Sequence, residues 1–66
     1  MEIDVNGVKQ TIHENSTVTE LMTQLDLPAI GVAVAVNQQV ISKVKWDETK
    51  LVAGDEVIVI KATCGG

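Results

Sequence analysis

The sequence predicts a small α+β domain with the element order ββαββ, followed by a short tail. Two observations support this prediction. Apolar and polar residues alternate at the start of the chain, which is the periodicity of a strand, whereas residues 18–25 carry apolar residues at helical spacing. The chain has 66 residues, 45% of them hydrophobic and 21% charged, which suits one folded core. We therefore expect a single domain over residues 1–66, with one helix on a small sheet.

The first two strands should form a hairpin around Asn6-Gly7, because Asn-Gly is the strongest short hairpin signal. Residues 1–5 precede this turn and residues 8–12 follow it. In the register of a two-residue turn, five of the six side chains on one face are apolar, so this face should pack on the core. The expected opposite pairs are Val5 with Val8, Ile3 with Gln10, and Met1 with Ile12.

The helix should begin at Val18, because Thr17 and Glu20 fit a capping box with Thr17 as N-cap. Apolar residues recur at i, i+3, i+4 and i+7 from Val18, which gives one apolar stripe typical of an ordinary core. Pro28 disfavours helical structure beyond residues 26–27. The prediction is a helix of about ten residues.

Residues 32–36 form the next predicted strand, with β-branched side chains on one face and small ones on the other. A turn at 37–39 leads the chain back towards residues 40–41 as a second hairpin. Segment 42–53 holds the only aromatic residue, Trp46, and suits an irregular connection or a short helical turn. Gly54-Asp55 then leads into a final strand over 56–62, whose apolar run indicates a strand at the sheet centre or buried on both sides.

The final strand carries apolar residues on both faces, with Val57 and Val59 on one and Ile58 and Ile60 on the other. One helix covers only one face of a sheet, so one of these pairs would remain accessible as a partner-docking surface. The alternative is that loops 28–31 and 42–53 fold over the second face.

The tail, residues 62–66, should be flexible, because Gly65 and Gly66 lose the most conformational entropy on ordering. Fully extended it would reach roughly 17 Å, so the Gly66 carboxylate could enter the active site of another protein. A glycine also leaves the acyl carbon unshielded. Cys64 is a candidate redox-active thiol or simply a small residue tolerated in the tail. The alternative for the whole tail is ordinary fraying of a chain end.

Composition limits the partners and the compartment. Nine acidic residues against five lysines give a net charge of -4, which works against binding nucleic acid and suits either a basic protein surface or solubility alone. One cysteine cannot form an internal disulfide and favours a cytoplasmic location. The acidic first residues and the absence of a long apolar stretch predict neither export nor a membrane partner.

The chain offers no convincing catalytic or metal-binding constellation. His13 is the only histidine, has no ligand partner at a recognisable spacing, and is interpreted as a surface residue. The acidic pairs at 47–48 and 55–56 are interpreted as solvated turn residues. Because the five glycines are not clustered before a helix, no phosphate-binding loop is present, and any ATP must be bound by a partner.

These features together resemble the thiamin-biosynthesis sulfur carrier family, among the ubiquitin-like β-grasp sulfur carriers. The resemblance spans nearly the whole chain. The chain departs from the family at Ser42-Lys43, where members often have Pro-Arg, and at Cys64, which the family does not require. The matching segments are the first strand with its Asn6-Gly7 turn, the helix opening at 17–21, the turn at 35–37, Trp46, the stretch 51–57, and Gly65-Gly66.

The resemblance implies a β-grasp fold on a small mixed sheet and a sulfur-carrying cycle. A ThiF-like adenylyltransferase would use ATP and magnesium to convert the Gly66 carboxylate into an acyl adenylate, and sulfur from a persulfide donor would replace AMP. The thiocarboxylate would then donate its sulfur to thiazole synthase. Gly65 would serve access of the tail. The chain would be a protein cosubstrate and not an enzyme, with no cofactor of its own.

Three other functions are compatible with the same C-terminal Gly-Gly. The chain could be the small subunit of molybdopterin synthase, which passes sulfur to a pterin precursor. It could be a ubiquitin-like modifier joined through Gly66 to a lysine of a target protein. It could also be an interaction module whose Gly-Gly end is inert.

Overall fold

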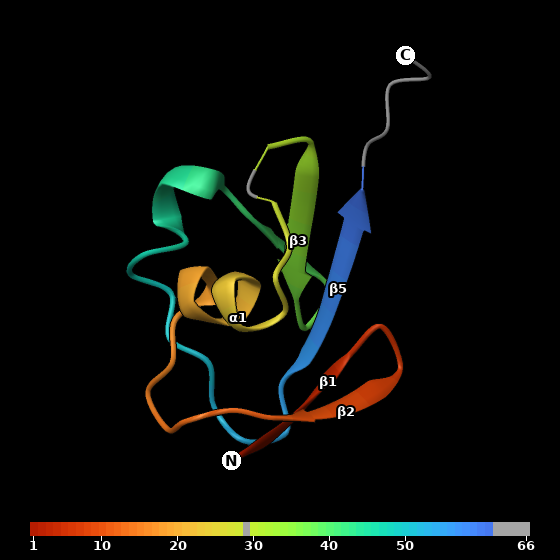
Figure 1. Ribbon diagram of the computed structural model, residues 1–66, viewed down its shortest axis with the longest axis vertical. Coiled ribbons are helices and arrows are strands. Elements are labelled where there is room, and N and C mark those ends of the chain that lie inside the picture. Colours follow the sequence, from red (N-terminus) through yellow and green to blue (C-terminus); the bar gives the residue numbers. More distant parts are fainter. Residues whose placement is uncertain (29, 62–66) are drawn as a thin grey trace.

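The computed structural model describes residues 1–28 and 30–61 (Figure 1). The predicted tail, which contains Cys64, Gly65 and Gly66, lies outside the described residues. The elements are β1 (Glu2–Val5), β2 (Val8–Thr11), α1 (Val18–Gln24), β3 (Val32–Val36), β4 (Gln39–Ile41), the 3-10 helix η1 (Lys43–Lys45) and β5 (Glu56–Lys61).

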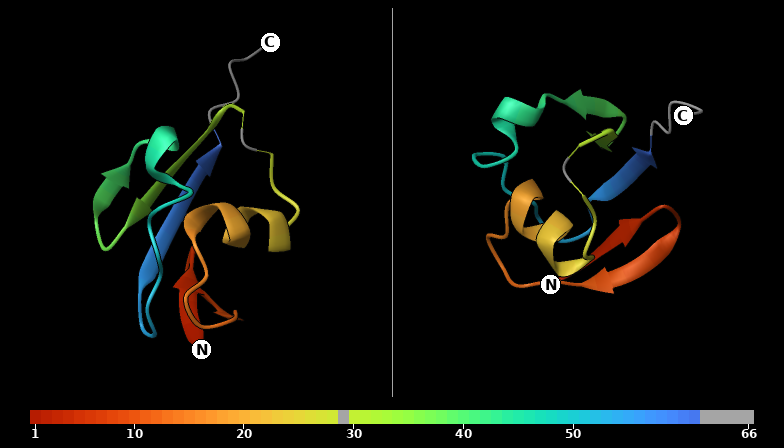
Figure 2. Two further views of the ribbon diagram at one scale, coloured as in Figure 1. Left: turned by 90° about the vertical axis from the view of Figure 1, so that its left-hand side faces the viewer. Right: turned by 45° about the horizontal axis from the view of Figure 1, so that its top comes forward.

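The described strands form one mixed sheet in the order β2-β1-β5-β3-β4. β5 runs parallel to β1 and antiparallel to β3, and the two hairpins are antiparallel. α1 packs against one face of this sheet (Figures 1 and 2). The predicted class, α+β with one helix on a small mixed sheet, is confirmed, and β5 occupies the sheet centre as expected. The predicted second hairpin is also confirmed, since β4 pairs with β3, although the element order ββαββ did not count β4 as a separate strand.

The first hairpin has the predicted register, with Val5 opposite Val8 and Ile3 opposite Gln10. Asn6 and Gly7 both have positive φ, +52° and +84°, as a two-residue hairpin turn of this hand requires. The burial of Val8 departs from the expectation that this whole face packs on the core, since Val8 is 58% exposed whereas Ile3 is 2% exposed. β2 is an edge strand of the sheet, and Val8 is its first residue, next to the turn.

The capping box at the start of α1 is confirmed. The Thr17 hydroxyl accepts from the Glu20 amide at 3.2 Å, and the Glu20 carboxylate accepts from the Thr17 amide at 2.9 Å. The predicted extent is wrong, because α1 ends at Gln24 and has seven residues. Asp26 turns the chain with φ of +56°, while its amide donates to Thr23 and the Leu27 amide donates to Met22. This Schellman pattern ends the helix before Pro28 can.

The core lies between α1 and the sheet. Segment 42–53 contributes to this side, since Trp46 and Leu51 are buried with the helix residues, and the Trp46 indole nitrogen donates to the Ile41 carbonyl at 3.1 Å. The alternative in which this segment covers the second face is therefore wrong. No helix among residues 1–28 and 30–61 is long and apolar enough to cross a bilayer. The buried apolar residues are Ile3, Val5, Ile12, Val18, Leu21, Met22, Val34, Trp46, Leu51 and Val57.

Candidate functional site

The two faces of β5 differ sharply in exposure. Val57 is completely buried and Val59 is half-buried against the core, whereas Ile58 and Ile60 are 37% and 57% exposed. The sequence predicted that one of these two pairs would remain accessible, and the structure shows that this pair is Ile58 and Ile60. Alternation along the strand directs Val57 and Val59 into the helix-side core and leaves Ile58 and Ile60 on the other face of the sheet.

Three residues of neighbouring strands complete an apolar area around this pair. Ala33 lies opposite Ile60, and Ala35 lies opposite both Ile58 and Val40. We call this set, Ala33, Ala35, Val40, Ile58 and Ile60, the open-face patch. Val40 is 74% exposed. Sequence reasoning missed the contribution of β3 and β4. The alternation of small residues in 32–36 was the available signal, but only strand pairing shows that these residues surround the isoleucines.

On β1 and at the start of β5 the open face carries charged side chains. Asp4 and Glu56 are opposite each other on β1 and β5, and Glu2 lies on the same face of β1. Lys9 approaches Glu2, with 3.7 Å between its ammonium nitrogen and the carboxylate. Three carboxylates against one ammonium leave this area negative. An apolar patch with an acidic flank suits a partner surface that is apolar at its centre and basic at its side.

The start of β5 is held by a buried carboxylate. Asp55 is only 7% exposed, and its two oxygens accept from the Asn37 side-chain amide at 3.0 Å and the Val52 backbone amide at 2.8 Å. The Asn37 side chain also accepts from the Glu56 amide at 3.0 Å. The interpretation of Asp55 as a solvated turn residue is therefore wrong, because its carboxylate joins the β3–β4 turn to β5. Glu56 is exposed, as expected.

Replacement of this carboxylate should destabilise the fold. We expect Asp55→Ala to lower the free energy of unfolding by about 2–4 kcal/mol, because two hydrogen bonds to a charged group are lost and their donors are left without partners. Urea unfolding followed by circular dichroism measures this change. Glu48→Ala is the control, since Glu48 is exposed and its contact with Lys45 at 3.4 Å should contribute less than about 1 kcal/mol. Equal stability of the two variants would contradict the prediction.

The other end of β5 continues past the first hairpin (Figures 1 and 2). At this point the Asn6 side chain contacts the backbone of Val59 twice. Its Oδ1 accepts from the Val59 amide at 2.8 Å, and its Nδ2 donates to the Val59 carbonyl at 3.2 Å. β5 therefore has a partner on each side as far as Val59, two residues before the last described residue of the strand.

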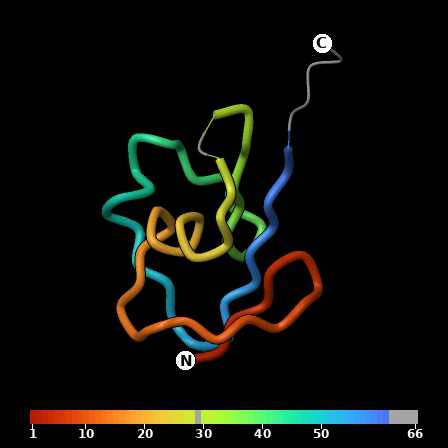
Figure 3. The backbone as a smooth tube through the Cα atoms, viewed as in Figure 1, coloured from red at the N-terminus to blue at the C-terminus, as the bar shows by residue number. Residues whose placement is uncertain are grey.

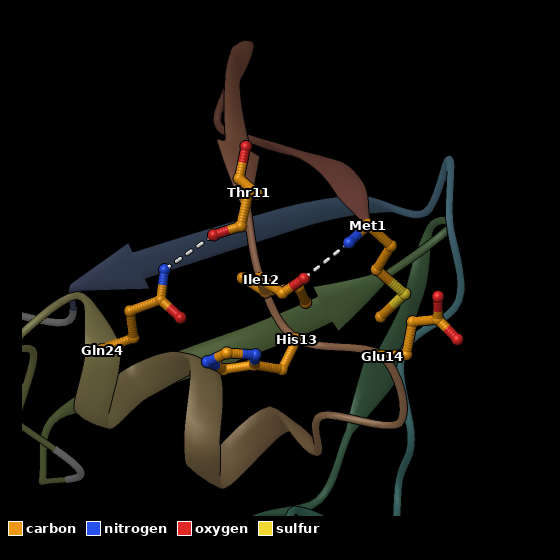
Figure 4. A pocket seen from close by; sticks show the side chains of 6 residues that line it. All are labelled: Met1, Thr11, Ile12, His13, Glu14 and Gln24. Atoms are coloured by element: carbon orange, nitrogen blue, oxygen red, sulfur yellow. Dashed lines mark hydrogen bonds between the residues drawn. The ribbon is translucent and has the colours of Figure 1, made fainter.

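A separate hollow of about 480 Å³ lies beside the N-terminus (Figure 4). Two of its polar groups make hydrogen bonds within the fold, since the Met1 ammonium donates to the Ile12 carbonyl at 2.7 Å and Gln24 donates to the Thr11 carbonyl at 2.9 Å. His13 lines the hollow and is exposed, as predicted. Figure 3 shows the N-terminus and the end of β5 at opposite ends of the molecule. Among residues 1–28 and 30–61, no group of three or more metal-ligating side chains comes together.

Comparisons with known proteins agree on one group. The model of the ThiS family matches residues 1–66. The chain is 32% identical to the sulfur carrier protein ThiS of Escherichia coli (strain K12) over the full length of both. The crystal structure of the thiamine biosynthesis protein ThiS from Geobacter metallireducens has a TM-score of 0.86 and 32% identity, with both chains covered completely. A solution structure of a thiamine biosynthesis protein from the same organism has a TM-score of 0.82 and 33% identity, covering 100% of this chain and 88% of the other.

Proposed function

The chain belongs to the ThiS family, and we propose that it is a sulfur carrier of thiamin biosynthesis that bears its sulfur as a thiocarboxylate on Gly66. The family match favours this pathway over the molybdopterin alternative. The β-grasp fold shared with the Geobacter metallireducens protein supports the same conclusion.

The proposed chemistry follows from the weak electrophilicity of a carboxylate. The Gly66 carboxylate attacks the α-phosphate of ATP on an adenylyltransferase, which gives an acyl adenylate and releases pyrophosphate. The terminal sulfur of a persulfide donor then attacks the acyl carbon, and AMP departs with the electrons of the broken C–O bond. A thiol reduces the resulting acyl disulfide, leaving the thiocarboxylate. Thiazole synthase accepts the sulfur and the carboxylate is regenerated.

The observation that carries the proposal is the position of the open-face patch on the strand that leads into the tail. Ile58 and Ile60 belong to β5, and Gly66 follows Ile60 by six residues. Those six residues can span roughly 20 Å when extended. A partner can therefore hold the folded body at the patch while it receives the Gly66 carboxylate in its active site. In this arrangement the body supplies docking and the partner supplies catalysis, so the chain acts as a cosubstrate.

In this proposal the cofactors belong to the partner enzyme and not to the chain. ATP and magnesium are bound by the adenylyltransferase, and Gly65 gives the tail a slender profile for entry into the partner. The negative flank of the open face speeds the encounter if the partner is basic there. We place this exchange in the cytoplasm, the compartment that a chain with a single cysteine favours.

Mass spectrometry of the intact protein and its fragments tests the proposal. The protein is incubated with its adenylyltransferase, ATP, magnesium and a persulfide donor. We expect oxygen to be replaced by sulfur at Gly66, only when ATP is present. Addition of oxygen to Met1, Met22 or Cys64 gives nearly the same nominal mass, so the shift must be localised to the last residue.

Cys64→Ser is the matched control for this measurement, because it removes the one thiol of the chain and keeps the tail length and both glycines. We expect it to be loaded like the wild-type chain. An unmodified Gly66 in the presence of a demonstrably active adenylyltransferase would contradict the sulfur-carrier function. Stable conjugates to lysines of other proteins would instead support a ubiquitin-like modifier.

A further inference from the structure

We propose that Asn6 is a positioning residue that fixes the direction in which β5 leaves the domain, and so the direction in which the tail is presented to the adenylyltransferase. The inference rests on the proposed function. The Asn-Gly turn accounts for the backbone of Asn6 but not for its side chain, whose two hydrogen bonds reach a residue 53 positions away.

The carboxamide of Asn6 replaces a pair of backbone hydrogen bonds that β1 does not make to β5 at Val59. β1 ends at Val5, and the Asn6 amide makes a further backbone contact with β5, to the Val57 carbonyl at 2.9 Å. The chain then turns away. The next β5 residue that points its amide and carbonyl in this direction is Val59, and the Asn6 side chain satisfies both groups. A carboxamide has the same donor and acceptor as a peptide group, so it extends the parallel pairing by one step.

This extension matters because of its place on the strand. Beyond Val57, β5 pairs on its other side with β3, up to Lys61 opposite Val32. Asn6 therefore gives the strand a second lateral restraint at Val59, seven residues before Gly66. A strand held on both sides has fewer directions available where it leaves the sheet. Productive entry of the tail is then less costly in entropy, because part of the ordering is already complete before docking.

The chain provides a matched control in the second hairpin. Asn37 also has positive φ, +51°, and its side chain also makes two hydrogen bonds to the β5 region, at Asp55 and Glu56. These contacts lie at the start of β5, whereas those of Asn6 lie towards its end. Glycine tolerates positive φ, so Asn6→Gly and Asn37→Gly each remove a carboxamide without straining a turn.

The two variants should differ in activity, and this difference should not follow from their stabilities. We expect kcat/KM for ATP-dependent sulfur loading to fall about three- to tenfold in Asn6→Gly and to stay within about twofold of wild type in Asn37→Gly. Asn37→Gly should have the lower or equal thermal midpoint, because it takes a partner from the buried Asp55. All rates are measured below both midpoints. A purely structural role of Asn6 predicts the opposite ranking of activities or equal activities.

Amide hydrogen exchange of the free protein gives a readout that needs no partner enzyme. The Val59 amide should exchange at least about tenfold faster in Asn6→Gly, while Asn37→Gly should accelerate the Glu56 amide instead. Unchanged Val59 exchange, or equal loading of the two variants, would overturn the inference. Failure of the wild-type chain to be loaded would overturn the proposed function, and Val59 exchange would still decide whether Asn6 orders the strand.

Discussion

Deletion of Gly66 should reduce ATP-dependent sulfur loading at least about a hundredfold. The truncated chain still ends in a carboxylate, that of Gly65, but this group is withdrawn by about 3.5 Å. A misplacement of 1 Å can already cost about a hundredfold in rate when the reacting groups must meet in a fixed geometry. In the proposed complex the adenylyltransferase holds the α-phosphate in its own site and holds the folded body at the open-face patch, so the shortened tail would not reach the reacting phosphorus.

Loading is measured by mass spectrometry of the terminal peptide over a time course. The buried apolar residues of the described chain lie between Ile3 and Val57, so we expect the thermal midpoint to match that of wild type. Cys64→Ser keeps the full length and should be loaded at the normal rate, which separates an effect of tail length from an effect of tail composition. A truncated chain that is loaded at the wild-type rate would show that the reaction does not require Gly66 and would contradict its assignment as the residue that bears the sulfur.

Ile60→Asp should raise the KM of the adenylyltransferase for this chain as its substrate by about tenfold or more, corresponding to about 1–2 kcal/mol of lost binding. Ile60 is 57% exposed at the end of the open-face patch nearest to the tail. A carboxylate at this position would have to be desolvated when an apolar partner surface covers it. The change in kcat should be smaller, because the tail and its carboxylate are unaltered.

Val8→Asp is the matched control for this substitution. Val8 is a β-branched residue on a strand, 58% exposed, and the same charge is introduced. It lies on the opposite side of the sheet from the patch, because its partner Val5 points into the core. Its KM should stay within about twofold of wild type. Equal effects of the two substitutions would show that net charge, and not contact at the open-face patch, governs binding.

The parts of the fold that the sequence predicted correctly depend on neighbouring residues. The Asn6-Gly7 turn sets the register of the first hairpin through two adjacent backbone conformations. The start of α1 follows from Thr17 and Glu20, whose hydrogen bonds close within one turn of helix. Such features need no knowledge of distant chain segments.

The errors arose where a distant or conformational effect was decisive. α1 ends early because Asp26 adopts positive φ, which no apolar spacing reveals. Asp55 is buried because Asn37, 18 residues away, brings an amide to its carboxylate. From its position between Gly54 and Glu56 alone, a solvated carboxylate was the simpler expectation.

The amino-acid sequence was enough to predict the fold class, the helix that became α1 and the central final strand, because these follow from periodicity and turn residues. It also contains the terminal Gly-Gly on which the proposed chemistry rests. Three features could be read only from the folded chain: which face of β5 is open, which residues of β3 and β4 surround Ile58 and Ile60, and the contact of Asn6 with Val59. The physical reason is strand pairing, since it brings together residues that are far apart along the chain and fixes which side chains share a face.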